Sequence, residues 1–168
     1  MAELYLPVAL RHRGDALFAA DPALLPIGLG ARDTLRLEMK YALYGNDIDD
    51  ETSPLEAGLG WVVKLKKSDF IGKFVLESQK AAGVSRQLVA FTMDGRVPAR
   101  AGYRVLDAEG QAIGRVTSAA PSPSLERNIG LAYVPTGHHA IGTPLRIEVR
   151  GRVEPATVVK APFIQPGS

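Results

Sequence analysis

Hydrophobic and polar positions follow two patterns along the chain, and the pattern changes near residue 84. Before this point apolar residues recur at helical spacing between glycines and prolines, whereas after it they alternate with polar residues over short stretches. Several short alternating stretches in succession favour a small β-barrel or sandwich. The pattern therefore predicts an α+β chain, with a partial α/β region over residues 1–83 and a β-rich domain over residues 84–168.

Six stretches of the second region have the alternation expected of strands. They are Leu88–Met93, Tyr103–Leu106, Ala112–Ser118, Ile129–Val134, Leu145–Val149 and Val153–Val159. The segments Asp107–Gly110 and Arg150–Gly151 contain the residue types of hairpin turns. We expect each of these turns to join two neighbouring strands.

The most regular stretch of the first region runs from Gly28 to Gly45. Two glycines lead into a run of good helix formers, and a third glycine closes it, so the pattern predicts one helix with a loop at each end. Arg32 and Arg36 are four residues apart, which places two positive charges on one helix face. Either Asp33 and Glu38 or an anionic ligand could neutralise them.

The rest of the first region predicts short elements. The expected elements are a strand at Glu3–Leu6, a helix over Val8–Ala20 interrupted by Gly14, a short helix from Pro54, a strand at Trp61–Leu65, and a helix from Ser68 or Asp69 to Gly83. The helix at Pro54 is expected because Ser53 and Glu56 have the spacing of a capping box, in which each side chain bonds the other residue's backbone N–H.

Composition narrows the class of protein. The chain has 168 residues, 46% of them hydrophobic, and no cysteine, so disulfides, thiol catalysis and iron–sulfur or zinc–thiolate sites are excluded on this chain. No window approaches the roughly 18 apolar residues of a membrane span, and charges interrupt residues 1–20 where a signal peptide needs an apolar centre. We therefore expect a cytoplasmic protein with no membrane partner.

The net charge of +2 is mild, and Lys and Arg do not cluster among aromatic residues. This pattern permits an anionic small molecule or an acidic partner but does not indicate nucleic acid.

Other candidate sites have simpler structural interpretations. The acidic turn Asn46–Glu51 lacks the glycine and glutamate spacing of a calcium loop, so we expect a solvated turn. Adjacent side chains do not usually face one metal, so His138 and His139 are expected in a surface loop. Exposed turns are likewise expected for Arg96 and Arg100, and turns or strand ends rather than nucleophilic roles for Ser118, Ser122 and Ser124.

Several motifs, taken in order, carry a family resemblance. They are Gly28-Leu-Gly-Ala-Arg-Asp-Thr-Leu-Arg-Leu-Glu38, Tyr44-Gly-Asn-Asp-Ile-Asp49, Thr52-Ser-Pro-Leu-Glu56, Phe70-Ile-Gly-Lys73, Gly114-Arg-Val-Thr-Ser118 and Ser122-Pro-Ser124. Together they resemble the glycine cleavage system T-protein, an aminomethyltransferase family. Members of this family are longer, and the chain is similar to their second half. The resemblance implies the end of the folate-binding region followed by the C-terminal β-barrel.

The resemblance also implies a reaction and a folate site. T-proteins pass the aminomethyl group carried by the lipoyl arm of the H-protein to tetrahydrofolate and release ammonia. The family's folate contacts fall on Glu3, Arg32 and Tyr41, although Met39 and Lys40 replace the usual Ala-Gly that precedes the last position. A carboxylate, a guanidinium and an aromatic ring suit an aminopterin edge, a carboxylate or carbonyl, and a ring face.

The implied contacts lead to a geometric prediction. Arg32 and Tyr41 are nine residues apart, so one continuous helix would place them on opposite sides. If both contact one ligand, the helix must end near Glu38 or Met39.

The resemblance leaves several functions open. The family's catalytic aspartate lies in the half that this chain does not match, so no catalytic residue is assigned. The chain can be a truncated or split T-protein that acts with a separate N-terminal half or self-associates, for which we expect dimerisation through residues 1–30. The alternative is a non-catalytic folate-binding or protein-docking module. A related folate-dependent protein of iron–sulfur maintenance shares the fold, but its cysteine-containing motif is absent from this chain. Sarcosine-type enzymes also share the fold and stay possible.

Overall fold

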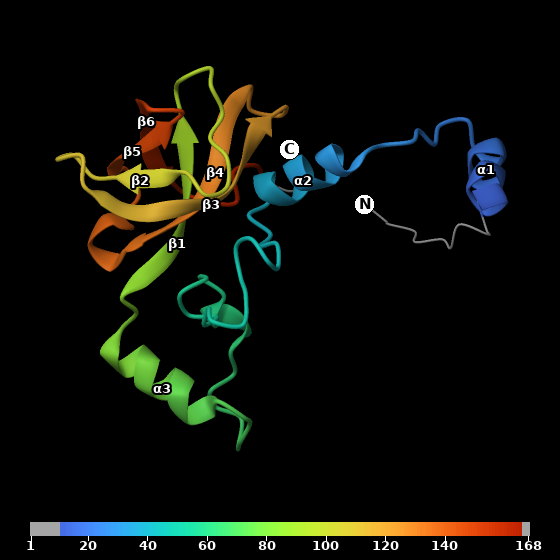
Figure 1. Ribbon diagram of the computed structural model, residues 1–168. Helices are drawn as coiled ribbons and strands as arrows, with labels where there is room; N and C mark the ends of the chain where they lie inside the picture. Colours follow the sequence, from blue (N-terminus) through green and yellow to red (C-terminus); the bar gives the residue numbers. More distant parts are fainter. Residues whose placement is uncertain (1–10, 166–168) are drawn as a thin grey trace. The chain divides into compact units, whose positions relative to one another are not determined.

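The computed structural model describes residues 11–165, and its α-helices precede its strands along the chain (Figure 1). The helices are α1 (Arg11–Ala20), α2 (Leu29–Glu38) and α3 (Lys73–Ala82). The expected strand Glu3–Leu6 lies outside the described residues. The chain divides into two compact units, Met1–Ala31 and Arg32–Ser168, and α1 belongs to the first. The division predicted between residues 83 and 84 stays a prediction.

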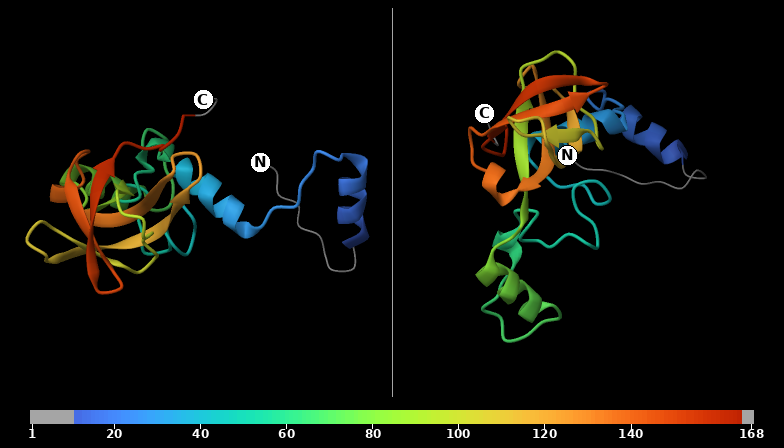
Figure 2. Two further views of the ribbon diagram at one scale, coloured as in Figure 1. Left: turned by 90° about the horizontal axis from the view of Figure 1, so that it is seen from above. Right: turned by 60° about the vertical axis from the view of Figure 1, so that its left-hand side comes forward.

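The second unit contains a closed barrel of six antiparallel strands (Figures 1 and 2). The strands are β1 (Arg86–Met93), β2 (Arg104–Leu106), β3 (Ala112–Ser122), β4 (Arg127–Pro135), β5 (Pro144–Val149) and β6 (Arg152–Val159). Their order around the barrel is β1-β4-β3-β2-β5-β6. All six predicted strands and the α+β class with a C-terminal barrel are therefore confirmed.

Both predicted hairpin turns are present and use the expected residues. Arg150 and Gly151 have φ angles of 50° and 78°, and they join the paired residues Val149 and Arg152. Two consecutive positive φ angles are the geometry of a type I′ turn, whose twist matches that of the strands.

The barrel is buried on its inside and, at β1 and β4, also on its outside. Val89, Phe91 and Met93 alternate along β1 and point into the inner core. The intervening Leu88 and Ala90 join a second cluster on the outer surface, where Leu37 of α2 is fully buried. Because alternate residues of a strand face opposite sides, β1 serves both cores. Leu37 therefore fastens the C-terminal end of α2 to the outer wall of the barrel.

The capping box forms, but it opens only a single turn. The backbone N–H of Ser53 donates to Glu56 Oε2 at 3.0 Å, and the N–H of Glu56 donates to Ser53 Oγ at 3.2 Å. Gly58 follows with a φ of 71° and closes the turn, with Leu59 N–H donating to the Pro54 carbonyl. The early glycine explains why the expected helix at Pro54 does not extend.

The segment between this turn and the barrel differs most from the prediction. The expected strand Trp61–Leu65 is wrong, because Gly60–Val62 forms a 3₁₀-helix, η2. The following helix was expected from Ser68 or Asp69, but Gly72 has a φ of 85° and delays its start to Lys73. Its predicted end at Gly83, which has a φ of 82°, is confirmed. None of the helices in residues 11–165 is long and apolar enough to cross a bilayer.

Candidate functional site

Helix α2 ends as the folate hypothesis requires. The backbone N–H of Lys40 donates to the Leu37 carbonyl, and the N–H of Tyr41 donates to the Arg36 carbonyl, both at 2.8 Å. Lys40 has a φ of 55°, so these bonds form a Schellman motif, the usual helix stop with a left-handed residue. The continuous helix expected up to Gly45 is therefore wrong, and the predicted end at Glu38 or Met39 is confirmed.

Arg36 joins the end of this helix to the barrel. Its guanidinium donates to Asp33 at 2.6 and 2.8 Å, to Asp47 Oδ2 at 2.5 Å and to Ser118 Oγ at 2.9 Å. A weaker bond of 3.4 Å reaches the Tyr41 carbonyl. Of the two acids expected to neutralise the arginines, Asp33 does so for Arg36. A single side chain thus connects the helix, the residues that follow it and strand β3.

Asp47 is the buried anion of this network. Its side chain is fully buried, and its carboxylate accepts hydrogen bonds from Arg36, the Leu43 backbone N–H, and the hydroxyls of Thr117 and Ser118. Neighbouring strand residues normally face opposite sides, but a register shift between Val116 and Ser118 lets both hydroxyls reach one carboxylate. The expectation that the acidic turn is fully solvated is therefore wrong at Asp47.

Tyr133 fixes the same turn from strand β4. Its hydroxyl donates to the Asp47 backbone carbonyl at 2.9 Å. Burial raises the pKa of Tyr133 to about 12, so the hydroxyl stays protonated and able to donate. The Arg86 guanidinium lies 4.7 Å from the centre of the Tyr133 ring, within range of a cation–π contact.

A second buried acid, Glu38, fixes the helix end to the other end of β3. Its side chain accepts hydrogen bonds from the Ser122 hydroxyl and from the hydroxyl and backbone N–H of Ser124, the last two at 3.0 and 3.2 Å. Its backbone carbonyl accepts from Phe163 N–H at 2.8 Å. The three serines therefore bind the two buried acids, which explains them without a nucleophilic role.

The predicted folate residues fall into two groups. Arg32 is exposed in the first half of α2, and Tyr41 is 62% exposed just after the helix end, so both side chains are accessible to a ligand. Glu3 lies outside the described residues. The assignment of all three as folate contacts stays a prediction.

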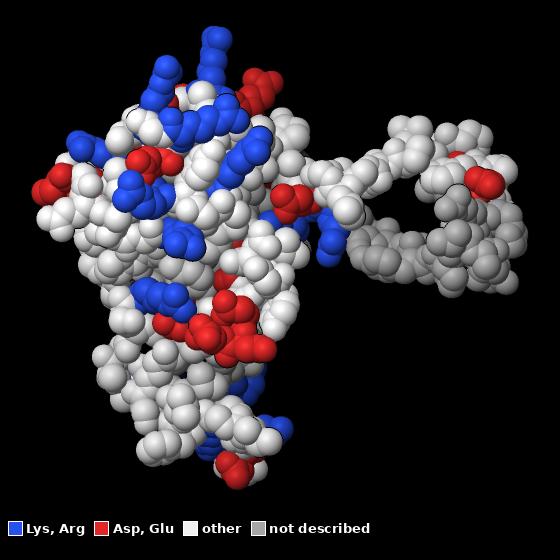
Figure 3. Space-filling view, viewed as in Figure 1, with Lys and Arg blue, Asp and Glu red and all other residues white. Residues whose placement is uncertain are grey.

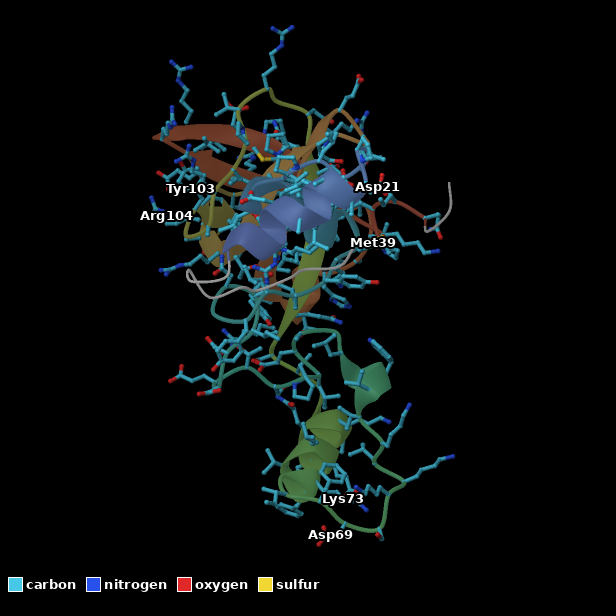
Figure 4. All side chains as sticks on the ribbon, turned by 90° about the vertical axis from the view of Figure 1, so that its right-hand side faces the viewer. Asp21, Met39, Asp69, Lys73, Tyr103 and Arg104 are labelled. Atoms are coloured by element: carbon cyan, nitrogen blue, oxygen red, sulfur yellow. The ribbon has the colours of Figure 1, made fainter. Side chains whose placement is uncertain are left out.

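Tyr41 lines a groove of about 420 Å³. Its walls combine the aromatic rings of Tyr41 and Trp61 with the apolar side chains of Met39, Leu59 and Leu88. Trp61 is 73% exposed, so a large part of its surface is open to a ligand. Figure 4 labels Met39, which marks this site at the end of α2.

Lys40 brings a positive charge to the groove. It is half-buried, and burial lowers its pKa. It also has the left-handed backbone that glycine adopts far more easily. Lys40 therefore destabilises the fold through both its backbone conformation and its half-buried ammonium. Residues that destabilise a fold in this way are concentrated at functional positions.

A larger cleft of about 670 Å³ lies between the acidic turn and the barrel, and acidic side chains gather beside it in Figure 3. Several of its polar groups already have partners, since Asp47 binds Arg36 and Arg86 forms an ion pair with Glu56 at 3.0 Å. The Thr52 hydroxyl donates to Asp49 and lowers the pKa of that carboxyl. We therefore place the candidate site in the smaller groove beside Tyr41.

The histidine and arginine candidates lie in surface turns and loops. His139 is exposed, and its Nδ1 contacts the Thr136 carbonyl within a surface turn. Arg96 and Arg100 are exposed in a loop. Within residues 11–165, no group of three or more His, Asp or Glu side chains is placed to hold a metal ion.

Sequence reasoning missed both buried acids, although the sequence contained a signal for them. Serines recur at positions 118, 122 and 124, at the end of the expected strand Ala112–Ser118 and just beyond it. Hydroxyls along a half-buried strand need polar partners, and acids after the preceding helix could have been proposed for them.

The geometry defines a class of protein, and comparisons give its family. The fold is an α+β chain in which helix α2 is anchored on the outside of a closed barrel. Residues 86–165 match the family described as glycine cleavage T-protein C-terminal barrel domain, and residues 3–67 match the GCVT N-terminal domain. The chain belongs to the glycine cleavage T-protein family.

Two curated relatives and one solved structure show the extent of the similarity. The chain is 56% identical over 144 residues to the aminomethyltransferase of Nostoc sp., which covers 85% of this chain and 38% of the relative. It is 51% identical over 165 residues to that of Phocaeicola vulgatus, covering 96% and 46%. The crystal structure of glycine cleavage system aminomethyltransferase T from Bartonella henselae matches with a TM-score of 0.87 and 36% identity, over 95% of this chain and 45% of that chain. The chain spans less than half the length of the curated relatives it matches.

Proposed function

We propose that this chain supplies the folate-binding part of an aminomethyltransferase of the glycine cleavage system. The complete reaction transfers the aminomethyl carbon from the lipoyl arm of the H-protein to tetrahydrofolate and releases ammonia. The curated relatives named above are aminomethyltransferases, which supports this reaction class. We propose the same substrates and the same H-protein partner for this chain.

The observation that carries the proposal is the groove beside Tyr41. Folate has a flat aromatic pterin and an anionic glutamate tail. The rings of Tyr41 and Trp61 can contact a flat ring by stacking, and the Lys40 ammonium can pair with an anion. Arg32 offers a second cation on the helix that leads to the groove, and its fork geometry suits a carboxylate or a carbonyl.

The chain's own residues bind and orient in this proposal. We assign no catalytic residue to this chain, because among residues 11–165 no carboxylate lines the groove to act on the folate nitrogen. Glu3 is the proposed partner of the aminopterin edge. A truncated or split T-protein is the form that fits a chain covering 38–46% of these relatives.

The test is titration calorimetry of the chain with tetrahydrofolate under anaerobic conditions. Arg32→Ala and Tyr41→Ala are each expected to weaken binding by about tenfold or more, since stacking and charge-assisted bonds contribute on the order of 1–3 kcal/mol. Tyr41→Phe keeps the ring and should bind like the parent chain. Arg152→Ala removes an exposed arginine of the barrel and serves as the control. Equal affinities in all five proteins, or no binding by the parent, would contradict the proposal.

Lys40→Gly separates stability from function. Glycine relieves the left-handed backbone and removes a half-buried ammonium, so we expect the free energy of unfolding to rise by about 1 kcal/mol. The same change should weaken tetrahydrofolate binding, because the positive charge is lost. Lys40→Met removes the ammonium but keeps the backbone strain, so it should weaken binding with a smaller gain in stability. Urea denaturation and calorimetry measure both effects, and unchanged affinity in both variants would remove Lys40 from the site.

A further inference from the structure

Helix α3 has a charged side and an apolar side. Lys73, Glu77 and Lys80 lie within about 60° of one another around the helix axis, and Lys73 pairs with Glu77 at 3.7 Å. Val75 lies on the opposite side, and Phe74 lies about 90° from the middle of the charged side. Ile71, in the turn before the helix, precedes them by the three- and four-residue spacing that shares a helix face. This spacing normally identifies the side of a helix that packs against other elements.

The apolar side of α3 is the exposed one. Phe74 and Val75 are 79% and 65% exposed, Ile71 is fully exposed, and no residue of α3 is buried. Further along the same side, Ser78, Ala81 and Ala82 are also exposed and carry no charge. A ten-residue helix gains most of its stability from packing of such a face. The α3 face, defined by Ile71, Phe74, Val75, Ser78, Ala81 and Ala82, therefore lacks its packing partner within residues 11–165.

We propose that the α3 face docks the part of the T-protein fold that this chain does not span. The Bartonella henselae structure covers 95% of this chain with a TM-score of 0.87, yet more than half of that structure lies outside the match. That part is large enough to cover a helix face, and the absence of charge on the face calls for an apolar contact. The proposal rests on family membership and is independent of the folate site.

The absence of cysteine allows a direct test. Phe74→Cys places a single thiol on the α3 face, and Val153→Cys places one at an exposed position of strand β6. Each variant is made as this chain alone and as a fusion to the portion of the Nostoc aminomethyltransferase that precedes its match to this chain. The rate of thiol alkylation is read for each cysteine by mass spectrometry. We expect the thiol at 74 to react at least tenfold more slowly in the fusion, and the thiol at 153 to be unchanged.

Two results would overturn the proposal. One is equally fast alkylation at position 74 in a fusion that melts cooperatively. The other is protection at position 74 in the chain alone that increases with protein concentration, because this would identify a second copy as the occupant. If the fusion does not fold, amide hydrogen exchange is measured in the intact Nostoc aminomethyltransferase instead. Fast exchange along the helix that matches α3 would then refute the docking.

Discussion

Arg36→Ala is expected to lower the free energy of unfolding by about 3–5 kcal/mol, the cost of leaving a buried charge without its partner. The Asp47 carboxylate is fully buried, and the Arg36 guanidinium is only 12% exposed. Alanine would leave Asp47 with hydroxyl and amide donors but no compensating charge. The same substitution would release Asp33, Ser118 and the Tyr41 carbonyl.

Urea denaturation of the two arginine variants measures this effect. Arg32→Ala is the matched control, since it changes the same residue type one turn earlier on α2 at an exposed position, where we expect a loss below about 1 kcal/mol. Arg36→Ala combined with Asp47→Ala should cost less than the sum of the single changes, because the unpaired charge disappears. Similar losses in the two single arginine variants would show that the buried pair does not hold the helix to the barrel.

The barrel was predictable because its signals are local. The alternation of apolar and polar residues predicts each strand, and turn residues such as Asp107 and Gly151 mark where strands end. Trp61–Leu65 has an equally strand-like composition but forms no strand, and its first two residues belong to the 3₁₀-helix Gly60–Val62. A strand needs a neighbour with which to form hydrogen bonds, and the composition of one segment does not say whether a neighbour exists.

The candidate site was only partly predictable for a similar reason. The end of α2 followed from requiring that two side chains face one ligand, although no glycine marks it and Lys40 adopts the left-handed geometry instead. The serine and threonine partners of Asp47 and Glu38 lie 70 or more positions further along the chain, in β3 and the turn that follows it. No local pattern pairs such distant residues. The bulge that turns two adjacent hydroxyls toward Asp47 is visible only once the register of β3 is known.

The second large effect on stability is expected at Gly114, where the barrel leaves no room for a Cβ. A Cβ on Gly114 of β3 would lie 2.0 Å from the Tyr133 carbonyl oxygen and 3.1 Å from its carbonyl carbon. These are backbone atoms of β4, so no side-chain rotation can make room, and the two strands must move apart. Tyr133 also holds Asp47 through its hydroxyl, so the displacement would reach the network that anchors α2.

We therefore expect Gly114→Ala to lower the free energy of unfolding by about 3 kcal/mol, at the upper end of the usual cost of overpacking. Gly137→Ala is the matched control, because a Cβ at Gly137 meets no atom within 4 Å and its backbone needs no positive φ. It should leave stability unchanged or raise it slightly by restricting the unfolded chain. Thermal denaturation followed by circular dichroism distinguishes the two variants. Equal melting temperatures for Gly114→Ala and the parent chain would mean that β3 and β4 can separate freely at this point. The groove beside Tyr41 would then not depend on a rigid barrel wall beneath α2.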